Sequence, residues 1–298
     1  MGLCMFEIIC SIDNAIINAE ILGTMQAKYR RWFLIWGMFF AVFVVRGLLP
    51  LLLVWVSAPD LSLWDAFTAM FNSDPHVQES IETSSKILLI GGGTFLIFLF
   101  FHWLFLEEKN FGLYGEKFFF SNGVWFFAVV SVILTLIVWY AINHNPMMAF
   151  GAVVGSTAFF IVHGFRQNAE IQEQKLKGGD LSDISKILYL EVIDATFSID
   201  GVLGAFAFTM SVPLILVGNT IGAIVVRQIT VGNIDKIRKY RFLKNGAMYS
   251  VLCLGVIMLL NSFGLHIPEY ISPVLTFGVV GYFFYKSVQD VKFSPCKT

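Results

Sequence analysis

The sequence predicts an all-α membrane protein with about nine transmembrane helices and an inverted internal repeat. Three observations predict this fold: an apolar composition, a series of apolar stretches long enough to cross a bilayer, and two similar acidic motifs in oppositely directed stretches. Of the 298 residues, 57% are hydrophobic and 14% are charged, and the mean hydropathy is +0.74. Because a soluble domain carries roughly 25% charged residues, a lipid bilayer is the expected environment.

A helix that crosses the bilayer needs roughly 20 mostly apolar residues. The stretches that meet this requirement are about 3–22, 33–56, 87–106, 124–142, 147–164, 187–210, 214–231, 247–262 and 271–288. The polar segment 165–186 is the expected cytoplasmic linker between an N-terminal membrane half, 1–164, and a C-terminal half, 187–298. In the third span, Gly91-Gly92-Gly93 is expected to allow close packing of helices.

Basic residues orient the spans, because cytoplasmic loops of membrane proteins are enriched in Lys and Arg. Of the 20 Lys and Arg residues, all but Arg46, Lys86 and Arg227 lie in segments that follow odd-numbered spans. The sequence therefore predicts a multi-pass protein of the bacterial inner (plasma) membrane, with its N-terminus outside and its C-terminus in the cytoplasm. No basic leader precedes the first span, so no cleaved signal peptide is expected.

The internal repeat pairs the first span with the sixth. Glu7 precedes Ser11-Ile-Asp13 by the same spacing at which Asp194 precedes Ser198-Ile-Asp200. The copies, one over 3–106 and one in the C-terminal half, start an odd number of spans apart and therefore enter the membrane from opposite sides. Inverted repeats are a recurrent plan of secondary transporters, with the binding site at the interface of the repeats. We therefore expect the first and sixth spans to lie against each other.

A second match in each half supports the repeat. Gly37 precedes Arg46 by the same interval that separates Gly218 from Arg227, and two valines come directly before each arginine. Both matches place an ionisable residue inside an apolar stretch. Such a residue costs ~2.5–3.5 kcal/mol at the bilayer centre unless it finds a partner or water. The repeat therefore predicts a polar site within the membrane.

Helical periodicity refines the position of this site. Polar or small residues share one stripe in each motif. These stripes are Glu7, Ser11, Asn14 and Asn18 in the first span, and Glu191, Asp194, Ser198, Gly201 and Ala205 in the sixth. Asp13 and Asp200 lie about 120° from their stripes in a regular helix. Either each helix breaks at Asp13-Asn14 and Asp200-Gly201 and turns its aspartate inward, or each helix stays unbroken.

An oxygen-rich site of this composition suits a hard divalent cation, because carboxylate, amide and hydroxyl oxygens are the ligands that such ions prefer. The candidate metal ligands are Glu7, Asp13, Asn14, Asn18, Glu191, Asp194, Ser198 and Asp200, with Arg46 and Arg227 as gating or charge-pairing residues. A competing interpretation is that the two arginines form only structural salt bridges with Asp13, Asp200 or Glu191.

Three segments carry a resemblance to a known family. These are Ser11-Ile-Asp13-Asn14-Ala15-Ile-Ile-Asn18-Ala19, the run from Tyr189 to Phe206, and the region from Val226-Arg227 to Gly246-Ala247. They resemble the TerC-like integral membrane proteins, in particular their branch with a domain of unknown function. Where relatives tend to carry Glu-His-Gly-Ala-His, this chain has Lys244-Asn245-Gly246-Ala247-Met248.

The resemblance implies a fold related to exporters of amino acids and of calcium and manganese. It also implies efflux of divalent metals, chiefly manganese, with links to tellurite resistance and to metalation of secreted enzymes. By motif matching it assigns the metal site to Glu7, Asp13 and Asn14 with Glu191, Asp194 and Asp200.

The predicted function is therefore a secondary transporter that exports a hard divalent cation, with Mn²⁺ as first candidate and Ca²⁺ as second, in exchange for protons. The alternative is a non-transporting scaffold that organises envelope or metal-stress complexes through segments 165–186 and 232–246. The sequence holds no phosphate-binding glycine loop, metalloprotease motif or serine elbow, so no enzyme is expected. The expected partners are the bilayer and the metal ion. No cofactor and no nucleic acid is expected, and a homo-oligomer or envelope-protein partners remain open.

Overall fold

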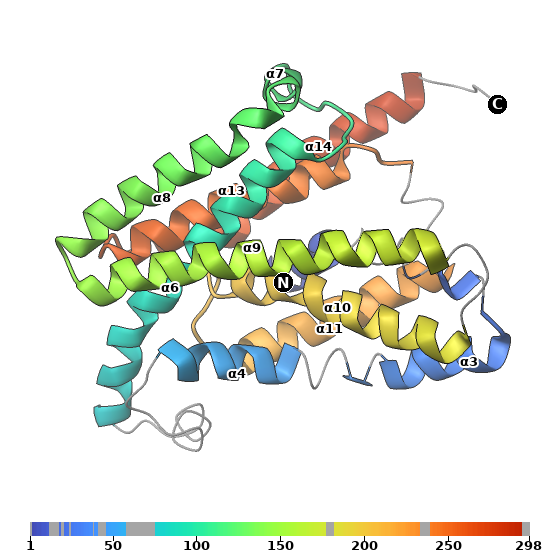
Figure 1. Cartoon of the computed structure of the whole chain (residues 1–298), viewed down its shortest axis with the longest axis horizontal. Helices are drawn as coiled ribbons and strands as arrows, with labels where there is room; N and C mark the ends of the chain where they lie inside the picture. Colours follow the sequence, from blue (N-terminus) through green and yellow to red (C-terminus); the bar gives the residue numbers. More distant parts are fainter. Residues whose placement is uncertain are drawn as a thin grey trace.

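The computed structural model describes residues 2–11, 18, 21–23, 25–37, 39–40, 46–57, 75–176, 182–232 and 239–293. Every regular element in these ranges is helical (Figure 1). The helices are α1 (Gly2–Cys10), α3 (Ala27–Trp32), α4 (Arg46–Ser57), α6 (Pro75–Leu106), α7 (Glu116–Ser121), α8 (Phe126–Ile142), α9 (Pro146–Leu176), α10 (Asp183–Ala205), α11 (Val212–Gly232), α13 (Leu243–Ser262) and α14 (Ile271–Phe293). A π-helical turn, Phe33–Gly37, and a 3₁₀ turn, Gly123–Trp125, complete them.

Several of these helices are long and apolar enough to cross a membrane. In the described part of the chain there are 5: Ser85–Leu106, Gly123–Ile142, Pro146–Asn168, Leu243–Ser262 and Ile271–Lys292. They coincide with the third, fourth, fifth, eighth and ninth predicted spans. The chain is therefore a multi-pass membrane protein.

The remaining predicted spans are less complete within the described ranges. The seventh span is represented by α11, whose apolar stretch Val212–Val226 is shorter than the other spans. The sixth span coincides with α10, which is long enough to cross, but three carboxylates interrupt its apolar run: Glu191, Asp194 and Asp200. The first and second spans fall partly outside the described residues, and α1 and α4 are their described helices.

Two helices continue beyond their predicted apolar limits. Pro75 begins α6, so part of the segment between the second and third predicted spans is helical. Proline suits the first position of a helix, where its missing N–H would have no intrahelical partner. At the other side of the molecule α9 extends to Leu176 and takes in much of the expected linker, whose Gln, Glu and Lys residues are good helix formers. The apolar residues therefore predict the limits of the membrane-crossing stretch, whereas the helix propensity of the polar residues beside it decides how far the helix continues.

Glycines hold α6 close to two neighbours. A Cβ added to Gly91 would lie 2.9 Å from the carbonyl oxygen of Gly151 in α9, and one added to Gly93 would lie 2.9 Å from that of Gly255 in α13. Such approaches leave no room for side chains between the backbones. The close packing predicted from the glycine triplet is therefore confirmed, and α6 lies between α9 and α13.

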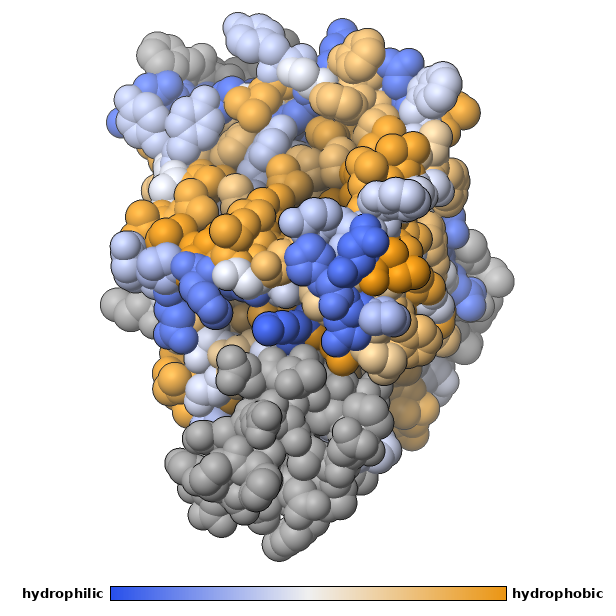
Figure 2. All heavy atoms as spheres, turned by 90° about the vertical axis from the view of Figure 1, so that its left-hand side faces the viewer, coloured by the Kyte–Doolittle hydropathy of each residue, from blue (hydrophilic) through white to orange (hydrophobic). Residues whose placement is uncertain are grey.

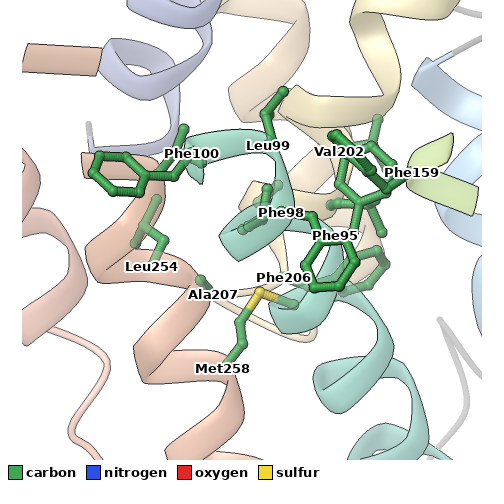
Figure 3. Packing of buried hydrophobic residues seen from close by; sticks show 14 of the residues in the cluster. Phe95, Phe98, Leu99, Phe100, Phe159, Val202, Phe206, Ala207, Leu254 and Met258 are labelled. Carbon is green, nitrogen blue, oxygen red and sulfur yellow. The ribbon is translucent and has the colours of Figure 1, made fainter. Parts of the chain in front are cut away.

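A buried cluster rich in aromatic residues joins α6 to α9, α10 and α13 (Figure 3). The ring of Phe159 lies 5.9 Å from that of Phe95 and 5.7 Å from that of Phe98, both edge to face. Val202 from α10 and Leu254 from α13 belong to the same buried cluster. In a bilayer this packing stabilises the bundle through close van der Waals contact, because lipid tails remove the usual hydrophobic gain.

The outward faces of the peripheral helices are apolar. Along α8, for example, Phe127, Val132, Leu136 and Trp139 are all exposed. Figure 2 shows the end of the molecule near the turn between α8 and α9, where hydrophilic residues lie across the middle and hydrophobic residues flank them. A polar end with apolar flanks is what a bilayer-spanning bundle requires.

Candidate intramembrane ion site

Glu7 of α1 is the centre of a buried polar group. Its Oε1 lies 2.7 Å from Nη2 of Arg46, and the side chains of the pair are 1% and 4% exposed. The Nε of Arg46 also donates to Oε1 at 3.0 Å, and the hydroxyl of Ser11 donates to the same oxygen at 2.9 Å. Asp194 lies close enough to interact with the charge of Arg46. Two sequence-predicted carboxylates therefore share one arginine.

Glycines make room for Glu7 between α10 and α11. A Cβ on Gly222 would lie 2.6 Å from Cβ and Cγ of Glu7, and one on Gly201 would overlap its Oε2. One turn further along α10, a Cβ on Gly204 would overlap the ring of Phe6. The expected contact between the first and sixth spans is therefore present between α1 and α10.

Asp200 has a partner that the sequence did not indicate. Its Oδ2 pairs with Nη2 of Arg166, which lies on α9. From the sequence, Arg166 belonged to the cytoplasmic linker and counted only toward orientation. Because α9 continues past the predicted fifth span, 147–164, Arg166 stays on the helix and reaches α10. The charge of Glu7 also acts on Asp200.

The helix α10 is unbroken through Asp200 and Gly201. The alternative of a regular helix is therefore confirmed for the sixth span. As expected for that geometry, Gly201 on the stripe faces Glu7, whereas Asp200 faces Arg166 on a different neighbour. In the first span, residues 12–17 lie outside the described residues, and the candidate ligands Asp13 and Asn14 lie with them.

The remaining candidates occupy varied positions. Asp194 and Ser198 are buried on α10, and the Ser198 hydroxyl donates to the Asp194 carbonyl at 2.6 Å. The carboxylate of Glu191 lies against Gly37, where a Cβ would overlap its Oε1. Asn18 is buried, while the side chain of Arg227 lies outside the described part.

Several buried polar side-chain atoms of this region make no hydrogen bond with the described residues. They include Oε2 of Glu7, Oδ1 of Asp200 and Oδ1 of Asn18, as well as both side-chain atoms of Asn219 in α11. Buried polar atoms of this kind normally have partners, so each needs an explanation. Among the described residues no three His, Cys, Asp or Glu side chains are grouped closely enough to hold a metal ion by themselves.

A second polar group lies at the end of the bundle that carries α7, and sequence reasoning missed it. Glu116 is buried, and its Oε2 accepts from the Gly112 N–H at 2.6 Å and from Nδ2 of Asn245 at 3.0 Å. Its Oε1 accepts from the Tyr249 hydroxyl at 3.1 Å. This network ties the loop after α6 to α13, in the Lys244–Met248 stretch at which the chain departs from the resembled family.

Charged residues flank this network. Lys244 lies 2.9 Å from Oε2 of Glu107. Burial alone would raise the pKa of Glu107, but Lys244 and the hydrogen bond from His102 outweigh burial and lower it. Lys109 donates to the Leu104 carbonyl at 2.6 Å at the end of α6, and burial lowers its pKa to about 8 despite Glu116 and Glu107.

One comparison with known proteins identifies a family. The model of the family described as "Protein of unknown function (DUF475)" matches residues 12–293. Searches of the curated proteins and of the solved structures found no match to the chain. The matched range takes in the helices from α3 to α14, with Arg46, Arg166 and Asp200, and leaves out α1 with Glu7. The chain therefore belongs to the protein family of unknown function DUF475.

Proposed function

We propose that this protein is a secondary transporter that exports a hard divalent cation, with Mn²⁺ as the first candidate and Ca²⁺ as the second. One observation carries the proposal. Two buried carboxylates, Glu7 and Asp200, each give one oxygen to an arginine and have a second oxygen with no hydrogen bond from the described residues. A scaffold needs no such oxygens, whereas a cation that enters the site would use them.

Competition between arginine and the ion would provide the switch. A divalent cation needs roughly two carboxylates to offset its charge, and amide oxygens can complete its six or more ligands. Asn219 and Asn18 supply buried amide oxygens in this region. While the site is empty, Arg46 and Arg166 neutralise Glu7 and Asp200, so the empty state leaves neither carboxylate as an uncompensated buried charge.

Reciprocal contacts support the inverted repeat, which we propose together with the nine-span topology. α1 lies against glycines of α11, since a Cβ on Gly218 would lie 2.8 Å from Cβ of Leu3. In the other half, α10 places Glu191 against Gly37, the residue that matches Gly218 in the repeat. Each first helix of one repeat thus contacts the second segment of the other. We propose the orientation predicted from the basic residues, with the α7 end in the cytoplasm of a bacterial inner membrane.

Transport by purified protein in liposomes tests the proposal. We expect Mn²⁺ flux into vesicles that contain an Mn²⁺-quenched dye. Asp200→Asn should lower it at least about tenfold, because a ligand is lost while Arg166 can extend to water. Glu269→Gln, in the exposed turn before α14, is the matched control and should transport like the parent. Equal flux in Asp200→Asn and the parent would refute the site.

A structural role would give a different result. If Asp200→Asn fails to accumulate in the membrane while Glu269→Gln accumulates normally, the salt-bridge interpretation is favoured over the transport site. Absence of flux of Mn²⁺ and Ca²⁺ in the well-folded parent would favour the scaffold.

A further inference from the structure

Two histidines touch each other near the α7 end of the bundle. The ring centroids of His102 in α6 and His163 in α9 are 3.9 Å apart. Aromatic rings enclose the pair: Phe126 lies 5.6 Å from His102, edge to face, and Phe159 stacks parallel to His163 at 5.9 Å. The pair therefore lies between α6, α8 and α9 and not at a freely solvated surface.

Towards the α7 end, ionisable groups connect the pair to water. Nδ1 of His102 lies 3.5 Å from Oε1 of Glu107, and Oε2 of Glu107 lies 2.9 Å from Nζ of Lys244. The Glu107 side chain is 28% exposed, in contrast to the buried His102. A proton on the pair can therefore reach solvent through Glu107.

In the other direction the pair leads to the candidate ion site. Arg166 follows His163 by three residues, so both lie on one face of α9, and Arg166 pairs with Asp200. Asp200 also interacts electrostatically with Glu107. The charged groups of the described residues that face the pair are thus Glu107 and, behind it, Lys244 on one side, and Arg166 on the other.

We propose that His102 and His163 carry the proton that is exchanged for the transported cation, an inference that rests on the proposed function. An imidazole can accept a proton at one nitrogen and release one from the other, which suits a relay near neutral pH. Two touching rings repel each other when both are charged, so the pair holds one proton at a time. Arg166 repels that proton on the side of the ion site, which directs it towards Glu107.

The proton balance of one cycle is simple. After the cation leaves Asp200, hydronium from the outer side gives its proton to the imidazole pair. An O–H bond of the hydronium breaks as an N–H bond forms, water is released, and Asp200 stays ionised for the next cation. The imidazolium then gives its proton to water at Glu107, so the pair ends the cycle neutral. Each cation that leaves the cell thus draws protons inward.

Liposomes with an internal pH dye and an imposed Mn²⁺ gradient test this inference with the full chain. We expect His102→Gln and His163→Gln to lower Mn²⁺-driven proton flux about 100-fold, the scale on which a proton-transferring side chain acts. Exchange of labelled Mn²⁺ for unlabelled Mn²⁺, which needs no net proton movement, should persist in both variants. His144→Gln, in the exposed turn between α8 and α9, is the control and should behave as the parent in both assays.

The outcomes separate the two proposals. Parent protein that moves Mn²⁺ without protons, or histidine variants that keep the parent's proton flux, would overturn the relay and leave the transporter intact. Variants that lose Mn²⁺ exchange together with proton flux would also overturn it, since the histidines would then support the site and not the proton. Parent protein that moves no cation would overturn both proposals.

Discussion

Arg46 on α4 meets Glu7 on α1 with two nitrogens on one carboxylate oxygen, Nη2 at 2.7 Å and Nε at 3.0 Å. Both side chains are buried, and they come from consecutive predicted spans, the first and the second. The sequence assigned Glu7 to the metal site and offered Asp13, Asp200 or Glu191 as partners of the arginines. The observed pair makes Glu7 both a candidate ligand and the counter-charge of Arg46.

Removal of one partner of this pair should be costlier than removal of both. Glu7→Gln leaves a buried guanidinium without its carboxylate and should lower the free energy of unfolding by about 3–5 kcal/mol. Unfolding by denaturant in mixed micelles measures this loss. The double variant Glu7→Gln/Arg46→Gln should recover most of it. If the double variant is as unstable as Glu7→Gln alone, the loss does not come from the stranded charge.

Replacement of a glycine beside Glu7 by a residue with a side chain should destabilise the protein. Gly222→Ala places a methyl group 2.6 Å from Cβ and Cγ of Glu7, so we expect a loss of about 1–3 kcal/mol from overpacking. Gly278→Ala and Gly281→Ala in α14 are matched controls, because nothing lies within 4 Å of the added Cβ. These two should be neutral or gain up to about 1 kcal/mol from helix propensity. Thermal unfolding in detergent compares the three variants.

Lys109 should be acetylated at a lower pH than an ordinary lysine. Burial lowers its pKa to about 8, so its amine is largely neutral at pH 9, where an ordinary lysine, with a pKa of about 10.4, is still charged. Acetylation followed by mass spectrometry at increasing pH should therefore give a midpoint near 8 for Lys109. A midpoint near that of an ordinary lysine would contradict the prediction.

The lowered pKa of Lys109 also makes the free energy of unfolding depend on pH. Between about pH 8 and 10.5 the unfolded chain holds the Lys109 proton and the folded chain does not, so this residue makes folding more favourable as pH rises. Lys109→Met should remove that dependence. A stability that falls through this range in the parent and not in Lys109→Met would reverse the sign and contradict the assignment.

Replacement of Glu116 by glutamine, its neutral isostere, should destabilise the protein. All three of its neighbours, the Gly112 N–H, Asn245 and Tyr249, donate to it. Glu116→Gln turns an amide N–H₂ towards one of these donors and should cost about 1–3 kcal/mol. Glu108→Gln, which changes an exposed carboxylate in the loop between α6 and α7, is the control and should stay within about 0.5 kcal/mol of the parent. Equal thermal stability of the two variants would show that the network contributes little.

The sequence was sufficient where the signal is local or periodic. Hydropathy located the described spans, the glycine triplet predicted the close approach of α6 to its neighbours, and the repeat predicted the contact of α1 with α10. It was insufficient where a partner depends on how helices cross. Arg166 lies beyond the fifth predicted span, 147–164, and no pattern in the sequence reveals that α9 brings it to Asp200.

Glu116 shows a second limit of sequence reading. A carboxylate between two spans is normally solvated, so composition gives no reason to expect it buried. Its three donors come from a loop glycine and from α13, more than a hundred residues later in the chain. A cue did exist in the Lys244–Met248 stretch, where Asn245 replaces the histidine that the resembled family tends to carry.

The close glycine contacts of α6 with α9 and α13 have a mechanical consequence. Where Gly91 meets Gly151 and Gly93 meets Gly255, backbone touches backbone, so no side chain can change rotamer to let the helices slide. The helices α6, α9 and α13 must therefore travel as one rigid unit. Any alternation of access has to occur at the joints that side chains form, above all between this unit and α1. If the proposed transport moves α1 relative to α10 as well, the tight contact of the Phe6 ring with Gly204 of α10 must change with it. Spin labels on α6 and α9 should keep a constant separation when Mn²⁺ is added, while the separation from α1 to α13 changes.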